Sequence, residues 1–170
     1  LALVIYSFTF TVFANLIGSP FYGIIAERVI ALERGLTDKT PTSTRALLAT
    51  AWGSFRRELQ IIAYMLPRTL GIALLTVMIS FVPIINIFAP LIAASWAAWS
   101  LALQYMDYPG DSDELSFTQV RQRAGKQRLL SLSFGLSALV AAAIPLVNLL
   151  LLPATVVGGT LLWCREYSEI

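Results

Sequence analysis

The chain has 170 residues, of which 57% are hydrophobic and only 13% are charged. A soluble domain typically carries about 25% charged residues, so this composition argues against a soluble enzyme and, equally, against a disordered chain. The sequence contains no histidine and one cysteine, which removes the commonest general base and any zinc cluster. We therefore expect no catalytic residue, no metal and no cofactor, and a net charge of +2 does not favour a nucleic acid partner.

The charged residues fall in blocks that are separated by long apolar stretches. Three stretches carry no charge at all, namely 1–26, 69–106 and 129–164. Charge-free apolar runs longer than about 18 residues are membrane segments by default. We therefore predict one membrane domain over 1–170, with a long transmembrane helix at 1–26, membrane hairpins at 69–106 and 129–164, and charged segments outside the bilayer at 27–68, 107–128 and 165–170.

The first stretch is not typical of a signal peptide. It has no basic n-region and no small-residue cleavage site. It opens without Met, in the middle of an apolar pattern that begins at Leu1. We therefore expect this sequence to lack its natural start.

The two later apolar stretches share a proline followed three residues later by asparagine, Pro83 with Asn86 and Pro145 with Asn148. Helices tend to stop before a proline and can restart with proline in the first turn. Each stretch is therefore predicted to form two short helices joined by an apolar turn around the asparagine. The second arms are expected to begin near 89–91 and 152–154.

The lengths of the arms predict how deeply these hairpins enter the membrane. The arms 69–82 and 91–106 have 14 and 16 residues, which is about 21 and 24 Å of helix. The hydrocarbon core is roughly 30 Å thick. We predict two short re-entrant, half-penetrating hairpins that return to the side they left. The alternative is two thin but complete transmembrane hairpins.

Either arrangement puts the charged segments on one side of the membrane. Residues 27–68 hold seven basic and four acidic residues, and the positive-inside rule therefore places them in the cytoplasm. Within this predicted helical head, a helix over 21–35 stops at Gly35, and an amphipathic helix runs from 43 or 44 to Leu66-Pro67. A further helix, led by Ser116, covers 117–128. The predicted fold is an all-α integral membrane protein.

Several blocks of the sequence resemble the bacterial CysZ-type sulfate permeases. The resemblance covers about 14–163 and is carried by Asn15-Leu16-Ile17-Gly18-Ser19-Pro20-Phe21, by Tyr64-Met65-Leu66-Pro67-Arg68, by Gln104-Tyr105-Met106-Asp107-Tyr108-Pro109, by Phe134-Gly135, by Ile144-Pro145-Leu146-Val147-Asn148-Leu149 and by Thr160-Leu161-Leu162-Trp163.

The resemblance implies sulfate import across the bacterial inner membrane for cysteine biosynthesis. It also implies a cytoplasmic head, long membrane helices, half-penetrating hairpins and assembly into a dimer or a larger homo-oligomer. The family's glycine-apolar-arginine motif, which binds the oxyanion, has no counterpart in this sequence. Its role is therefore assigned to no residue here.

Two sets of residues are candidates for an anion pathway. Asn86 and Asn148 lie at the expected hairpin tips, where helix N-termini would offer donors near the midplane. The alternative is that each asparagine only caps its turn. A second set could form a cytoplasmic vestibule, because guanidinium groups match oxyanions and carboxylates could pair with them. It comprises Arg56, Arg57, Arg68, Arg121, Arg123 and Arg128, with Glu27, Glu58 and Asp107 as partners. The alternative is ordinary positive-inside bias with solvated ion pairs.

We therefore predict sulfate transport by a multi-pass protein of the inner membrane, with sulfate and membrane lipid as its partners and no enzymatic activity. The alternative is a non-transporting membrane scaffold whose amphipathic helices bind a partner protein. Tryptophans such as Trp96, Trp99 and Trp163 are interpreted as interfacial anchors rather than ligand contacts.

Overall fold

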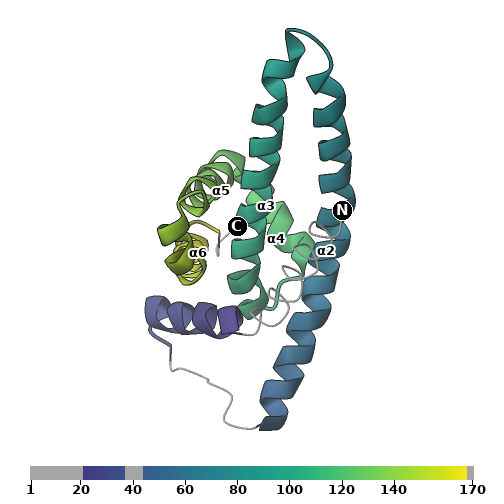
Figure 1. Ribbon diagram of the computed structural model, residues 1–170. Coiled ribbons are helices and arrows are strands. Elements are labelled where there is room, and N and C mark those ends of the chain that lie inside the picture. Colours follow the sequence, from purple (N-terminus) through teal and green to yellow (C-terminus); the bar gives the residue numbers. More distant parts are fainter. Residues whose placement is uncertain (1–20, 37–43, 168–170) are drawn as a thin grey trace.

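A computed structural model describes residues 21–36 and 44–167, and every regular element within these ranges is a helix (Figure 1). A helix over 21–34 is followed by α2 (Thr44–Ser80), the short 3-10 helix η1 (Ile85–Phe88), α3 (Ala89–Ser112), α4 (Phe117–Lys126), α5 (Arg128–Ala142) and α6 (Pro145–Glu166). The predicted all-α class is confirmed. Most of the predicted transmembrane helix at 1–26 lies outside the described residues.

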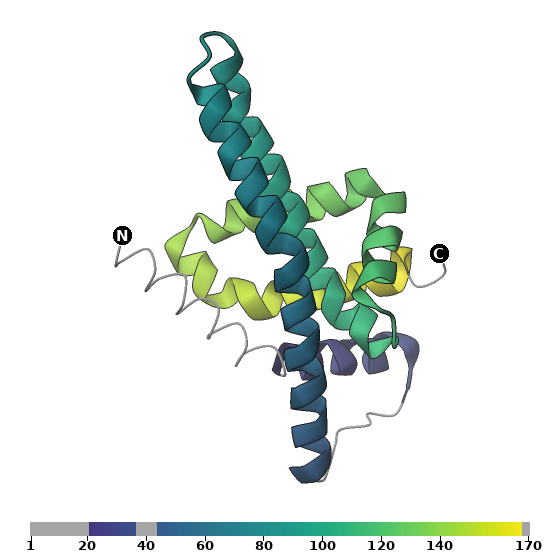
Figure 2. The same cartoon turned by 90° about the vertical axis from the view of Figure 1, so that its right-hand side faces the viewer.

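Helices α2 and α3 form a long antiparallel hairpin, whose two arms lie side by side in both views (Figures 1 and 2). The turn between them contains Ile84 in the left-handed region, at φ 71°, and Asn86 within η1. The backbone N–H of Asn86 donates to the Val82 carbonyl oxygen at 3.0 Å, and Pro90 lies in the first turn of α3. An apolar turn around Asn86, with the second arm beginning near Ala89, is therefore confirmed.

The predicted helix end at Leu66-Pro67 is wrong. Helix α2 is 37 residues long in all and runs through Pro67 to Ser80. A proline inside a helix removes one backbone hydrogen bond, at a cost of about 3 kcal/mol in water. The helix persists beyond the proline because side chains on both sides of it contact neighbouring helices: Tyr64 contacts Phe117 of α4, and Thr69 accepts a hydrogen bond from Trp96 of α3. The amphipathic helix and the first hairpin arm are therefore one continuous element, and α3 contains Pro109 in the same way.

The expected start of the second arm at 152–154 is also wrong. Helix α5 ends at Ala142, and α6 begins at Pro145 after an extended Ile144 (φ −97°, ψ 111°). The residue before a proline favours this extended conformation, so Pro145 begins the helix and Pro153 lies inside it. Asn148 consequently belongs to the first turn of α6 and not to the connecting turn.

The pair α5 and α6 runs across α3 at a steep angle (Figures 1 and 2). Glycine makes this crossing close. A Cβ atom on Gly135 of α5 would overlap the carbonyl oxygen of Ala98 and lie 3.2 Å from the Ala102 Cβ. On α6, a Cβ atom on Gly159 would lie 3.2 Å from the Tyr105 carbonyl oxygen. Small residues at crossings let helix backbones approach each other closely, as is common in membrane proteins.

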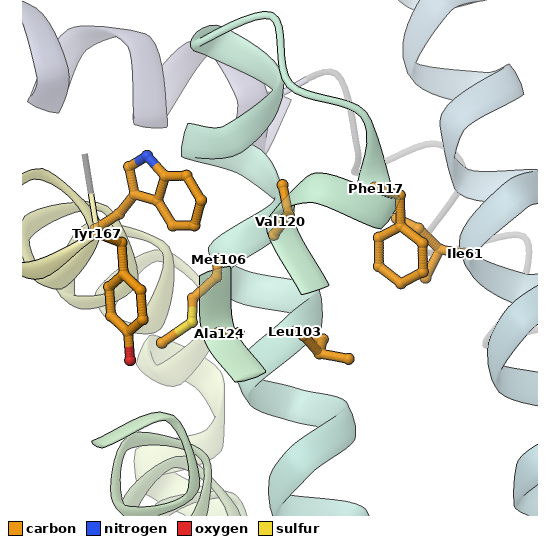
Figure 3. Packing of buried hydrophobic residues seen from close by; sticks show 8 residues of the cluster. Ile61, Leu103, Met106, Phe117, Val120, Ala124 and Tyr167 are labelled. Carbon is orange, nitrogen blue, oxygen red and sulfur yellow. The ribbon is translucent and has the colours of Figure 1, made fainter. Parts of the chain in front are cut away.

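The main apolar core lies where α4 and α6 meet α3 (Figure 3). Leu103, Met106, Val120 and Trp163 are fully buried, and each contributes about 1.5–3 kcal/mol on burial. The Trp163 indole stacks on the Tyr167 ring, with centroids 5.7 Å apart. This core fixes α4 against the base of the hairpin.

Two local signals in the sequence end or begin helices as predicted. The helix over 21–34 stops at Gly35, whose φ of +64° suits glycine. Helix α4 begins with a capping box. The backbone N–H of Gln119 donates to the Ser116 hydroxyl oxygen, and the backbone N–H of Ser116 donates to the Gln119 side-chain oxygen. It ends at Lys126, two residues before the predicted end.

The outer half of the α2/α3 hairpin exposes large apolar side chains. Within the described residues, α2 and α3 are each long and apolar enough to cross a membrane, and the apolar windows of these two helices are largely unburied. The exposed side chains continue around the turn and include Leu74, Met78, Phe81, Ile84 and Phe88. A contiguous apolar surface of this kind marks a face that contacts lipid or another protein.

Candidate functional site: a basic groove between three helices

A groove of about 760 Å³ opens between α3, α4 and α5. We call it the basic groove, because three of the side chains that line it are cationic. Its walls are Trp99 from α3, Arg121, Gln122, Gly125 and Lys126 from α4, and Arg128 and Leu132 from α5. Two of the arginines predicted for an anion vestibule therefore share one surface.

The backbone break between α4 and α5 brings these cations together. Gln127 has non-helical angles (φ −117°, ψ 56°), so the chain changes direction between Lys126 and Arg128. The Gln127 side chain donates to the Glu166 carbonyl oxygen at 2.8 Å, and the Arg128 Nε donates to the Gly125 carbonyl oxygen at 3.2 Å. These bonds hold the corner that forms one end of the groove.

Tyr64 of α2 links Arg68 to the groove residue Arg121. The guanidinium carbons of Arg68 and Arg121 lie 3.7 and 4.5 Å from the centroid of the Tyr64 ring. An aromatic face attracts a cation, so the ring can hold two guanidinium groups near one another. Among the described residues, the guanidinium groups of Arg68, Arg121 and Arg128 have no carboxylate partner.

Arg57 lies apart from the basic groove and binds acceptors within the protein. Its Nε and Nη2 donate to both carboxylate oxygens of Asp107, at 2.6 and 2.7 Å, and its Nη1 donates to Asp111 and to the Leu115 carbonyl oxygen. The Asp107 side chain is only 4% exposed. The structure thus pairs two members of the predicted vestibule set, Arg57 and Asp107, and the buried Glu58 follows Arg57 in the chain.

The remaining predicted residues are dispersed. Arg123 donates to the Tyr167 carbonyl oxygen at 2.9 Å and lies over the Trp163 ring. Arg56 is exposed on α2, and Glu27 is exposed on the helix over 21–34. Asn86 is exposed at the tip of the first hairpin, in η1, beyond the start of α3 at Ala89, which is itself about 15 Å of helix from Trp99.

Sequence reasoning missed Gln122, Gly125, Lys126 and Leu132. The spacing in the sequence offered a signal for two of them. Gly125 lies four residues after Arg121, and Lys126 lies four residues after Gln122, so the members of each pair are neighbours on the helix surface. Trp99 was interpreted only as an interfacial anchor, although it forms one wall of the groove. Among the described residues, no cluster of three or more metal-ligating side chains is present.

The sequence model of the family described as "Sulfate transporter CysZ/Etoposide-induced protein 2.4" matches residues 1–153. The protein named sulfate transporter CysZ from Pseudomonas syringae pv. tomato is 41% identical over 166 residues, which cover 98% of this chain and 64% of that protein. Its namesake from Pseudomonas paraeruginosa is 40% identical, over 99% of this chain and 67% of that protein.

A more distant protein of the same name, from Pectobacterium atrosepticum, is 32% identical over 99% of this chain. The chain spans 60–67% of the length of these three relatives. The similarity extends over nearly the whole chain and includes the hairpins and the helices of the basic groove. The chain therefore belongs to the CysZ family of sulfate transporters.

Proposed function

We propose that the protein carrying this chain transports sulfate across the bacterial inner membrane and supplies it for cysteine biosynthesis. Family membership carries this proposal, because relatives 41% and 40% identical are named sulfate transporters. The basic groove supports it, because guanidinium groups recognise tetrahedral oxyanions and those of Arg121 and Arg128 have no carboxylate partner among the described residues. In this proposal the protein is a permease and not an enzyme, and it works as a homo-oligomer surrounded by membrane lipid.

The proposed arrangement in the membrane places the basic groove at the cytoplasmic surface and the hairpin tip near the midplane. From Trp99 at the groove to Ala89 at the start of α3 is about 15 Å of helix, half of the roughly 30 Å hydrocarbon core. Between Arg68 and the end of α2 no residue is charged. In the second hairpin, α5 has 15 residues, about 22 Å, and is shorter than this core, whereas α6 has 22 residues, about 33 Å.

In this arrangement the charged segments form a cytoplasmic head. The half of α2 that contains Arg57 and the end of α3 that contains Asp107 and Asp111 point away from the apolar tip. A chain that crossed completely at the tip would leave this polar network at the same membrane surface. The head therefore agrees with either depth of the hairpin, and only the depth separates the two arrangements.

Sulfate carries two charges, so its transfer into lipid without hydrogen-bond donors is prohibitive. We assign its capture to Arg121 and Arg128 in the basic groove, with Arg68 beside them. Deeper in the membrane, the start of α3 offers backbone amides and a positive dipole end, and Asn86 adds a neutral donor. Asn148 lies in the first turn of α6, where an equivalent contribution is proposed.

Uptake of radiolabelled sulfate into proteoliposomes tests this function, with the full-length protein. We expect selective sulfate uptake that the Arg121→Gln/Arg128→Gln variant slows by about tenfold or more below saturation, because two charge-assisted hydrogen bonds are lost. Arg56→Gln removes an exposed cation outside the groove and should leave uptake unchanged. No sulfate flux by the folded wild-type protein would contradict transport and favour the scaffold. Normal flux in the double variant would contradict only the role of the groove.

A further inference from the structure

A second groove, of about 410 Å³, lies along the α2/α3 hairpin and shares Trp99 with the basic groove. We call it the apolar groove. Its walls are Ile72 from α2, Phe88 from η1, and Leu91, Ile92, Ser95, Trp96 and Trp99 from α3. Trp99 belongs to both grooves, so an elongated ligand could occupy both of them at once.

The apolar groove has the length of one lipid leaflet. From Phe88 to Trp99 along the hairpin is about 16 Å, while half of the hydrocarbon core is roughly 15 Å. Its wall is fixed in place, because the Trp96 Nε1 donates to the Thr69 hydroxyl oxygen of α2 at 3.0 Å. An acyl chain could therefore lie along this face without a rearrangement of the hairpin.

The charges at the two ends of this surface differ sharply. At the Trp99 end the basic groove offers Arg121, Lys126 and Arg128, whereas Ser95 is the only residue lining the apolar groove that is neither aliphatic nor aromatic. An anionic lipid has the same distribution, with a phosphate at one end and a hydrocarbon chain at the other. Each cation near an anionic lipid surface contributes about 1 kcal/mol of attraction.

We propose that the basic and apolar grooves together bind one anionic phospholipid. Its phosphate lies against Arg121 and Arg128, and one acyl chain follows α3 from Trp99 toward Phe88. The basic groove is much larger than a single sulfate ion, which leaves room for a phospholipid headgroup. This inference rests on the proposed arrangement of the hairpin in the membrane, but it requires no transport of sulfate. Sulfate and lipid would nevertheless compete for the same guanidinium groups.

Native mass spectrometry of the full-length protein, in neutral detergent without sulfate, tests this proposal. The probes are phosphatidylglycerol, phosphatidylcholine and inorganic phosphate. We expect phosphatidylglycerol to be retained at least about tenfold more tightly than phosphatidylcholine, because only the former has a net negative charge. Equal retention of the two phospholipids would overturn the proposal, since it would indicate unspecific surrounding lipid.

Two variants separate the two halves of the site. Arg121→Gln/Arg128→Gln should weaken phosphatidylglycerol binding by about tenfold or more, toward the level of phosphatidylcholine. Ser95→Phe fills the apolar groove but keeps every cation, so it should weaken phosphatidylglycerol binding and leave inorganic phosphate binding unchanged. Ser133→Phe is a matched control on the exposed face of α5.

Circular dichroism and gel filtration verify that each variant folds before its lipid binding is compared. If both folded variants keep wild-type affinity for phosphatidylglycerol, the proposal is overturned. It is also overturned if Ser95→Phe has no effect while the double variant loses affinity for phosphatidylglycerol and for inorganic phosphate, because the groove then binds only the oxyanion.

Discussion

Asp113 joins three helices through a single carboxylate. It accepts hydrogen bonds from Arg34 at 2.7 and 3.0 Å and from the Trp163 indole at 2.9 Å, so it ties the helix over 21–34 and α6 to the end of α3. Partial burial alone would raise the pKa of Asp113, but the bonds from Arg34 and Trp163 outweigh it and lower the pKa below the ordinary value.

The lowered pKa of Asp113 predicts a loss of stability in acid. Because the folded pKa is below the unfolded one, near 3.9, the stabilisation is complete above that value and disappears as the pH falls through the folded pKa. Asp113→Asn should cost about 1 kcal/mol of unfolding free energy at pH 7 and nothing at low pH. Thermal unfolding in detergent between pH 7 and pH 3 measures this. Glu33→Gln, which breaks the more exposed pair with Arg165, should have a smaller effect at pH 7.

Arg57 is predicted to stabilise the fold rather than to contact sulfate. Removal of one partner from a buried ion pair costs about 3–5 kcal/mol, and Arg57→Lys loses the bidentate geometry with Asp107. We expect Arg57→Lys to lower the unfolding midpoint strongly, while the remaining folded protein binds sulfate as the wild type does. Equilibrium binding of radiolabelled sulfate to folded protein measures the second part. A selective loss of sulfate affinity at unchanged stability would make Arg57 an anion contact.

At the scale of elements, the crossing of α5 over α3 depends on one missing side chain. A Cβ atom on Gly135 would overlap the Ala98 carbonyl oxygen, so Gly135→Ala must push the two helices apart. Overpacking of this kind typically costs 1–3 kcal/mol, which chemical denaturation in detergent can measure. Gly71→Ala in α2, where a Cβ atom meets nothing within 4 Å, is the matched control. Equal stability of the two variants would show that the crossing adapts.

The same elements show what the sequence could and could not predict. The end of the helix at Gly35, the start of α4 at Ser116 and the turn around Asn86 follow from local rules, and all three were predicted. The passage of α2 through Pro67 was not, because it depends on contacts of Tyr64 and Thr69 with α4 and α3, which the local sequence does not reveal. Asn148 was misplaced for a related reason, since two prolines in one stretch left the start of the helix ambiguous.

The candidate site was predictable only in part. The structure places Arg121 and Arg128, both selected from the sequence as oxyanion-binding candidates, in one groove, and their binding of an anion stays a prediction. The pairing of Arg57 with Asp107, 50 residues away, could not be read from local spacing. Nor could the sequence distinguish an arginine that forms an internal ion pair, such as Arg57, from arginines that line the groove, such as Arg121 and Arg128.

At the scale of the whole molecule, the depth of the hairpin tip is open to direct measurement. Ile84 is 87% exposed at the tip, so Ile84→Cys in a Cys164→Ser background places one thiol there. If the hairpin enters only half of the bilayer, membrane-impermeant maleimides should label this thiol poorly from either side, because the thiol lies in lipid. Arg56→Cys, on an exposed charged surface, should be labelled from the cytoplasmic side. Efficient labelling of Ile84→Cys from the periplasm would establish a complete crossing.

The continuity of α2 has a mechanical consequence. Its 37 residues form a rod about 55 Å long, with the charged half at one end and the apolar tip at the other. Near its middle, Tyr64 contacts Phe117 of α4 and Thr69 accepts a hydrogen bond from Trp96 of α3, so the rod is held on both sides of Pro67. Pro67, between them, leaves one backbone bond unmade and so sets the place where the rod can bend. We therefore expect any bend of α2 to lie at this position, between the charged half that Arg57 ties to α3 and the apolar tip.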